Sequence, residues 1–143
     1  MGLRLHIEGA DSIFLDEHSI KTLRFMTDTP NDSNARSTDV VNTIKIEGKI
    51  LTSVDGLPVD DTMKIAKWSK VRAEIADSYR VVTAEVVVAS QIVRKFVFPQ
   101  AFVVDYDERF GDMEGAGEFI LTVRQKKDLF DKTEIEGGFE APA

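Results

Sequence analysis

The chain has 143 residues, of which 43% are hydrophobic, so it is the size of one domain and long enough to bury one core. Its formal net charge of −7 argues against a protein whose main task is to bind nucleic-acid phosphates, since that affinity comes from Lys and Arg. The absence of cysteine excludes a disulfide framework, a thiolate nucleophile and a cysteine-based metal site.

The N-terminal residues lack the basic region and continuous apolar run of a secretory signal, and no apolar run reaches transmembrane length. We therefore expect a soluble product that is made and assembled in the cytoplasm. Neither a signal peptide nor membrane insertion is expected.

Alternating apolar and polar residues predict three strands at the start of the chain. A turn at residues 9–11 separates the first two, and the third spans residues 20–27. Their apolar positions are, in chain order, Leu3, Leu5 and Ile7; Ile13 and Leu15; Leu23 and Phe25.

Residues 27–39 are almost entirely polar and rich in Asn, Asp, Ser and Thr. Such a segment buries too little area to offset its ordering entropy, which predicts a long flexible loop unless a partner orders it. A strand is expected at residues 40–50, where Gly48 is a candidate for a bulge. Asp55-Gly56 and Pro58 then predict a turn.

Residues 60–75 predict the one clear helix, with Asp60 or Asp61 as its N-terminal cap. One face carries Ile65, Trp68, Val71, Arg72 and Ile75, and the outer surface carries Lys64, Lys67 and Lys70. This amphipathic pattern places the helix on one side or end of a sheet, with Trp68 as its anchor.

The strongest β signal runs from Tyr79 to Gln125. Residues 79–89 predict a strand with one dry face and one mixed face: Val82, Ala84, Val86 and Val88 against Tyr79, Val81, Thr83, Glu85 and Val87. A second strand, 92–98, meets Pro99, which indicates an edge, a bulge or a break before the chain resumes at 101–106.

The turn-rich segment 109–117 then leads to a closing strand with Phe119, Leu121 and Val123 on one face. The segment offers Gly111, Gly115 and Gly117 for positive φ. Together the elements predict a single mainly β domain over residues 1–143. We expect a closed or nearly closed antiparallel β-barrel or sandwich with one packed α-helix, the loop at 27–39 and a C-terminal tail at 131–143.

Candidate chemistry is sparse. The acidic residues Asp105, Asp107, Glu108, Asp112 and Glu114 do not fit a calcium loop, because a loop starting at Asp105 has Arg109, Phe110 and Ala116 where an oxygen ligand, Gly and Glu are needed. Alternation also divides them between two faces, which favours solvated charges.

The only histidines are His6 and His18. Asp16, His18 and Ser19 are too close together in an extended segment to form a nucleophile, base and orienting acid, and no zinc-site spacing occurs. No phosphate-binding or dinucleotide-binding motif is present. We therefore assign no catalytic, cofactor-binding or metal residue and expect a protein that is not an enzyme. The basic helix surface is either solvated or a contact for an acidic partner, which includes another copy of this chain.

The element order from residue 60 to 127 carries a resemblance: a helix, DDTMKIAKWSKVRAE; two strands, YRVVTAEVVVAS and QIVRKFVFPQAFVVDYDE; and a closing strand, GEFILTVRQKK. This order resembles the tube-forming superfamily that includes the Hcp proteins of type VI secretion and the tail-tube proteins of contractile phages.

The resemblance implies a structural subunit that forms rings, with a hexamer expected, stacked into a hollow tube of a phage tail, a phage-tail-like particle or a contractile injection system. Sheath and baseplate proteins are then the expected partners, and the virion or tail-like particle is the final location. Residues 27–39 are compatible with the extended arm by which family members contact neighbours, and Glu85 is a candidate for lining the lumen. The alternatives are a baseplate or hub component on the same fold and a monomeric barrel that binds a small apolar ligand.

Overall fold

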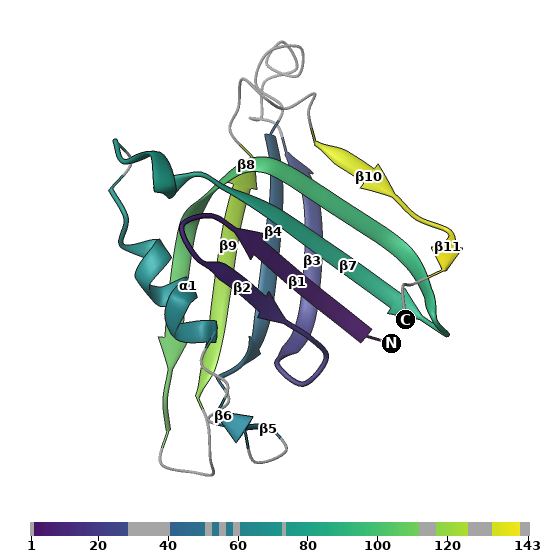
Figure 1. The fold of residues 1–143 in the computed structure, drawn as a ribbon, viewed down its shortest axis with the longest axis horizontal. Helices are drawn as coiled ribbons and strands as arrows, with labels where there is room; N and C mark the ends of the chain where they lie inside the picture. The colour runs from purple at the N-terminus through teal and green to yellow at the C-terminus, as the bar shows by residue number, and fades with distance from the viewer. Residues whose placement is uncertain are drawn as a thin grey trace.

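The structure is a computed structural model that describes residues 2–28, 41–50, 53–54, 57–58, 61–72, 74–111, 117–125 and 133–140. These residues are mainly β, with one α-helix and one short 3₁₀ helix (Figure 1). The elements in chain order are β1 (Gly2–Glu8), β2 (Ser12–Leu15), β3 (Ile20–Asp28), β4 (Val41–Lys49), β5 (Ser53–Val54), β6 (Leu57–Pro58), α1 (Asp61–Ser69), η2 (Ala76–Ser78), β7 (Arg80–Val88), β8 (Gln91–Arg109), β9 (Glu118–Gln125), β10 (Glu134–Glu136) and β11 (Phe139–Glu140).

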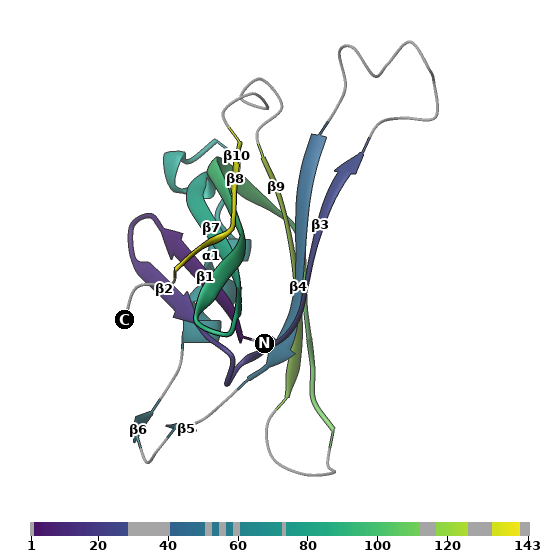
Figure 2. The same cartoon turned by 90° about the vertical axis from the view of Figure 1, so that its right-hand side faces the viewer.

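A single antiparallel sheet with the order β2-β1-β7-β8-β9-β4-β3 folds over into two facing layers (Figure 2). The first half of β8 pairs with β7 in one layer, and its second half pairs with β9 in the other. The terminal strands β2 and β3 do not pair with each other, so the sheet is open. The prediction of a mainly β antiparallel fold with one packed helix is confirmed, whereas a closed barrel is not formed.

The core lies between the two layers and is filled by aliphatic and aromatic side chains. Its buried members are Leu5, Ile7, Ile13, Leu15, Ile20, Ile44, Ile46, Ile65, Trp68, Val82, Ala84, Phe96, Phe98, Ala101, Phe119, Leu121 and Val123. Each large member contributes about 1.5–3 kcal/mol through burial. The alternating apolar positions predicted in β1, β2, β4 and β9 all face this core, and Leu23 and Phe25 of β3 pack against it.

The helix α1 lies beside β2 and the second half of β8, and it covers that side of the sandwich (Figure 1). Trp68 is 2% exposed, and its indole Nε1 donates to the carbonyl of Ser78 at 3.2 Å, which confirms its predicted anchoring role. The helix is shorter than predicted. It ends at Ser69, so Val71 and Arg72 follow it, and Ile75 is 48% exposed.

The strand β8 runs unbroken through Pro99. Of the edge, bulge or break that Pro99 indicates in the sequence, the structure has the bulge. Val82 pairs with Phe98 but Arg80 pairs with Ala101, which leaves an extra residue on β8 at Pro99–Gln100. Proline has no N–H to donate, and a bulge needs none at that position. The bulge coincides with the corner at which β8 passes from one layer to the other.

The structure gives three glycines roles that differ from those expected from the sequence. The irregularity near Gly48 is an extra residue, Lys21, on the partner strand β3. Gly48 is required instead by close packing, because a Cβ there would lie 2.3 Å from the carbonyl oxygen of Ser19. Gly111 and Gly117 do not adopt positive φ, and Gly115 lies outside the described residues.

Burial of the residues next to the β7–β8 turn departs from the alternation expected for β7. Val87 is buried and Val88 is 39% exposed, at the point where β8 carries an extra residue opposite Val86 and Val87. The turn itself consists of Ala89 and Ser90, both with positive φ, at 51° and 65°.

The segments expected to be irregular are structured in part. Thr27 and Asp28 belong to β3, and the rest of the predicted loop, 29–39, lies outside the described residues, as do Asp55 and Gly56. Within the predicted tail, β10 and β11 pair with β8. Among the described residues, no helix has the length and apolarity to cross a membrane.

Candidate assembly surface

The two terminal strands of the sheet differ in how their outer edges are covered. At the β2 edge, a carboxylate oxygen of Asp61 accepts a hydrogen bond from the Phe14 amide at 2.8 Å. Lys64 donates to the Ser12 carbonyl at 3.1 Å and pairs with Asp61 at 3.2 Å. The helix α1 therefore occupies backbone groups that another strand would need, which blocks strand addition at β2. Asp61 serves this edge, and Asp60, the other predicted cap, lies outside the described residues.

The edge of β3 is open. This strand pairs with β4 on one side, and no described strand pairs with its other side. Lys21, Thr22 and Arg24 are exposed along it. An unpaired edge exposes a row of N–H and C=O groups that is ready to pair with another chain, so β3 is the candidate edge for contact between copies.

A third edge, on the first half of β8, is covered by the chain itself. Glu134–Glu136 pair with Lys95–Val97, and Phe139 and Glu140 pair with Ile92 and Gln91. Gly137 passes so close to the Val93 carbonyl that a side chain there would clash. The C-terminal strands thus occupy a row of backbone groups that is otherwise available for pairing.

One face of the layer β8-β9-β4-β3 points away from the core and is uncovered by any other described element. Residues opposite one another in the ladder share a face of the sheet. Residues that alternate with the buried ones therefore make up the outward face. It carries Thr22, Arg24 and Met26 from β3; Thr43, Lys45, Glu47 and Lys49 from β4; Glu118, Ile120, Thr122 and Arg124 from β9; and Asp105, Asp107 and Arg109 from β8. We call this the polar face. Basic and acidic side chains interleave across it.

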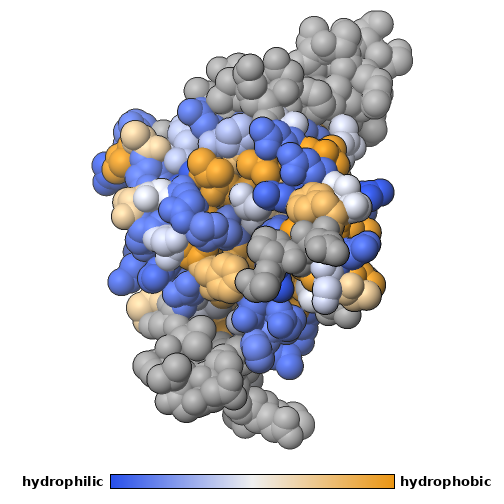
Figure 3. Space-filling model, turned by 45° about the vertical axis from the view of Figure 1, so that its right-hand side comes forward, coloured by the Kyte–Doolittle hydropathy of each residue, from blue (hydrophilic) through white to orange (hydrophobic). Residues whose placement is uncertain are grey.

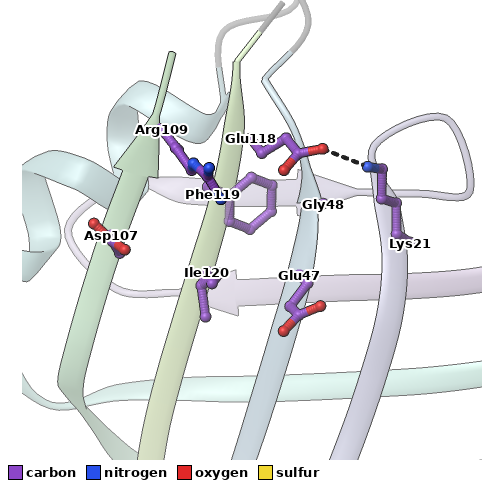
Figure 4. A pocket seen from close by; sticks show the side chains of 8 residues that line it. All are labelled: Lys21, Glu47, Gly48, Asp107, Arg109, Glu118, Phe119 and Ile120. Atoms are coloured by element: carbon purple, nitrogen blue, oxygen red, sulfur yellow. Dashed lines mark hydrogen bonds and ion pairs between the residues drawn. The ribbon is translucent and has the colours of Figure 1, made fainter. Parts of the chain in front are cut away.

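Cross-strand polar contacts order the polar face. Lys21 reaches over β4 to Glu118, with Nζ 2.7 Å from Oε1 (Figure 4). The hydrogen bond and charge of Lys21 hold the pKa of Glu118 below its usual value. Arg124 Nε donates to the Thr43 hydroxyl at 3.3 Å. The side chains around Lys21 and Glu118 enclose a depression of about 170 Å³, which is smaller than the roughly 300 Å³ at which small-molecule sites begin.

The acidic run falls as alternation predicted. Asp105 and Asp107 are exposed on the polar face, whereas Tyr106 is half-buried and its ring stacks on Phe119 at 6.4 Å. The Tyr106 hydroxyl donates to Glu108 at 2.7 Å, and burial together with this neighbouring carboxylate raises the pKa of Tyr106. No group of three potential metal ligands occurs among the described residues. Asp112 and Glu114 lie outside them.

The histidines lie in local turn contacts. His18 Nδ1 lies 3.0 Å from Asp16 Oδ1, and the Ser19 amide donates to the Asp16 carbonyl, so these three residues form a turn. His6 Nε2 contacts both Glu8 and Ser12, a trio that the sequence reading did not identify.

A second unforeseen cluster surrounds Arg80, whose side chain is 4% exposed. Its guanidinium binds Asp77 and Asp11 and lies 5.3 Å above the Trp68 ring. Asp77 also accepts from the Ala10 amide at 2.9 Å. The cluster ties the β1–β2 turn to η2, β7 and α1. Asp77 lies three residues before Arg80, but Asp11 comes from the distant β1–β2 turn, so the sequence alone does not reveal the cluster.

Apolar side chains exposed at the surface are scattered. Figure 3 shows small apolar patches separated by hydrophilic residues on one side of the molecule. Within the described part of the chain, the exposed large apolar residues are Phe14, Met63, Ile75, Val81, Val88, Val93, Val104, Phe110, Ile135 and Phe139. Phe110 is the most exposed of them, at 67%.

No protein-family model matches the chain, and no curated protein matches it by sequence. Solved structures do match. Hcp1 from Flavobacterium johnsoniae has 14% identity and a TM-score of 0.55, with 96% of this chain and 98% of that chain covered. A chain of the anti-feeding prophage baseplate has 10% identity and a TM-score of 0.55, with 94% and 92% covered. A chain of the anti-feeding prophage cap, which terminates the tube, has 8% identity and a TM-score of 0.52, with 94% and 89% covered.

These likenesses extend over nearly the whole of each chain and show a shared fold. The class that the fold defines is therefore the open, antiparallel Hcp-like sandwich with one packed helix. At this level of identity the comparisons establish the fold relationship, and the role of the chain follows as a proposal.

Proposed function

We propose that this chain is a structural subunit, without catalytic activity, that assembles with copies of itself into rings stacked as the hollow tube of a phage tail, a phage-tail-like particle or a contractile injection system. The observation that carries the proposal is the likeness to Hcp1 and to the prophage baseplate and cap chains over at least 94% of this chain. In this proposal the ring is a hexamer, sheath and baseplate proteins are the outer partners, and the final location is the virion or tail-like particle.

The edges of the sheet support such an assembly. Ring closure needs a heterologous contact between two different surfaces of the same chain. The open β3 edge supplies one pairing surface, while α1 blocks the β2 edge. The polar face ends at β3, so pairing at this edge would continue the same face into the next copy. We propose this face as the lumen wall.

From the sequence, Glu85 is expected to line the lumen, but Glu85 is not part of the polar face that we propose as the lumen wall. Glu85 lies on β7 in the other layer, opposite Lys95 of β8 and Arg4 of β1. The polar face instead carries interleaved charges of both signs, which reduces the long-range field that either sign alone would produce.

The test is electron microscopy of the purified chain combined with sedimentation velocity. We expect rings or tubes whose mass is a multiple of 16.0 kDa. A chain that remains monomeric at high concentration, with neither rings nor tubes on grids, would contradict the proposal. The contact between copies at β3 can also be tested by substitution. Arg24→Glu should weaken assembly and leave the circular dichroism spectrum of the monomer unchanged.

A second candidate role is a baseplate, hub or cap component on the same fold. The specific observation in its favour is that the prophage baseplate and cap chains match with TM-scores close to that of Hcp1. Copy number in purified particles separates the two roles, because a tube subunit occurs in many rings and a baseplate or cap component in one or a few. The interior between the layers is filled by the core, so nothing favours a ligand-binding barrel.

A further inference from the structure

A small aromatic depression lies where the end of α1, η2 and the corner of β8 meet. It measures about 170 Å³ and is lined by Trp68, Ser69, Val71, Ser78, Tyr79, Phe102 and Val103. Trp68 is almost fully buried and forms part of its wall, and Tyr79 and Phe102 meet edge to face at 6.0 Å. A site this small suits one side chain better than a cofactor or metabolite. We call it the aromatic pocket.

The surface next to the aromatic pocket is basic. Residues 62–72 contain Lys64, Lys67, Lys70 and Arg72 and no acidic residue. Lys67, Lys70 and Arg72 are exposed. An occupant of the pocket that carries acidic neighbours would therefore gain electrostatic attraction as well as apolar contact.

The opposite end of β8 has the complementary features. Phe110 follows the strand and is 67% exposed, and its ring lies against Gly117, where a Cβ would come within 2.5 Å of it. Gly117 thus leaves space for the ring beside the backbone. Of the exposed charged residues just before Phe110, Asp107 and Arg109 lie on the polar face, whereas Glu108 lies on the other face of the strand. In Figure 1, the second half of β8 runs from the corner near η2 past α1 and down to this end.

The contact between these features has to be intermolecular. Phe102 and Phe110 lie on or just after the same extended strand, so about 26 Å separates them at 3.3 Å per residue. Phe110 therefore cannot enter the pocket of its own chain. A contact between the corner of β8 in one copy and the C-terminal end of β8 in another is heterologous, and its repetition generates a stack.

We propose that the Phe110 end of one copy docks into the aromatic pocket of a second copy, with Glu108 facing Lys67 and Lys70. This contact deepens the proposed tube function, on which it rests, by assigning the surfaces that join one ring to the next. Aromatic rings in the pocket favour an edge-to-face arrangement with the entering phenyl group. The basic residues attract the Glu108 carboxylate and orient the docking end.

Cysteine cross-linking tests the contact directly, because the native chain contains no cysteine. The double variant Ser69→Cys with Gly111→Cys keeps Phe110 and places one thiol in the pocket and one beside the docking ring, where an added Cβ meets no atom within 4 Å. Mild oxidation should give a ladder of dimers, trimers and longer species on a non-reducing gel. Added salt should weaken the ladder. The matched control, Ser69→Cys with Val88→Cys, has its second thiol at the β7–β8 turn and should give no ladder.

A second variant removes the anchor without adding a thiol. Phe110→Ser should raise the protein concentration needed for stacking at least about tenfold, as expected for loss of an aromatic hot spot, while single rings persist. Val93→Ser, which also shortens an exposed apolar side chain, is the control and should stack normally.

The outcomes distinguish failure of the docking contact from failure of the proposed tube function. If the native chain forms rings or tubes but the double-cysteine variant gives no ladder and Phe110→Ser stacks normally, the docking contact is wrong and the tube function stands. If the native chain forms neither rings nor tubes, the tube function fails and the ring-to-ring contact fails with it.

Discussion

The guanidinium of Arg80 binds the carboxylate of Asp77 through two hydrogen bonds, Nε to Oδ1 at 3.1 Å and Nη2 to Oδ2 at 2.6 Å. A third bond joins Nη1 to Asp11 at 2.7 Å. These contacts supply the partners that a nearly buried charge requires. They also explain why Gly9 faces Arg80 without a side chain, since a Cβ there would lie 2.5 Å from Nε.

Replacement of Arg80 by Lys tests the importance of the forked geometry. Lys keeps the charge but cannot make two parallel bonds to one carboxylate. We expect Arg80→Lys to lower the free energy of unfolding by roughly 2 kcal/mol, measured by urea denaturation. Arg24→Lys, at an exposed position of β3, is the control and should change it by less than about 0.5 kcal/mol. Equal stability of the two variants would argue against a structural role for the fork.

The same pair predicts a pH dependence. The Arg80 hydrogen bonds hold the pKa of Asp77 below its usual value. A lowered folded-state pKa means that the pair stabilises the fold fully above the unfolded-state pKa of about 3.9, and that this stabilisation is lost as pH falls through the folded-state pKa. The stability difference between the native chain and Asp77→Asn should therefore be constant from pH 5 to 7 and shrink below about pH 4. A difference that grows on acidification would contradict this assignment.

The β7–β8 turn predicts a stabilising substitution. Ala89 has φ of 51°, a left-handed conformation that glycine adopts at lower cost than alanine. We expect Ala89→Gly to raise the free energy of unfolding by about 0.5–1 kcal/mol. The matched control is Ala66→Gly in α1, where the same chemical change should lower it by about 1 kcal/mol. Thermal or urea denaturation of the two variants should give opposite signs.

The covering of the β2 edge can be tested at Asp61. Asp61→Ala removes the acceptor for the Phe14 amide and the partner of Lys64, so the edge of β2 becomes accessible. We expect a loss of about 1 kcal/mol in unfolding free energy and faster hydrogen exchange at the Phe14 amide. Lys67→Ala, on the exposed surface of the same helix, should change neither quantity appreciably. Unchanged exchange at Phe14 in Asp61→Ala would show that the edge is protected by other means.

Much of the sandwich follows from local patterns in the sequence. Alternation places the buried residues of β1, β2, β4 and β9 correctly because each of these strands has one face on the core and one toward solvent. Trp68 is identified as the helix anchor for a similar reason, since the helical period assigns it to the apolar face.

The remainder depends on contacts between distant segments. Val71 and Ile75 fit the helical period, but the chain leaves the helix after Ser69 to reach η2, so periodicity overestimates its length. The pairing of Glu134–Glu136 with β8 is a backbone interaction at an edge, and the exposed side chains of β10 leave no burial pattern in the sequence. Neither the polar face nor the open β3 edge could be predicted from the sequence, because both depend on which strands become neighbours.

The strand β8 belongs to both layers, and this has consequences for how the protein folds. It hydrogen-bonds to β7, β9, β10 and β11, so detachment of β8 would remove a neighbour from each layer at once. The two layers should therefore unfold in a single cooperative transition. The β1–β7 and β4–β9 pairings join residues more than 60 positions apart, and such non-local topologies fold in milliseconds to seconds. Newly synthesised chains would thus expose unpaired edges for some time before the sandwich forms.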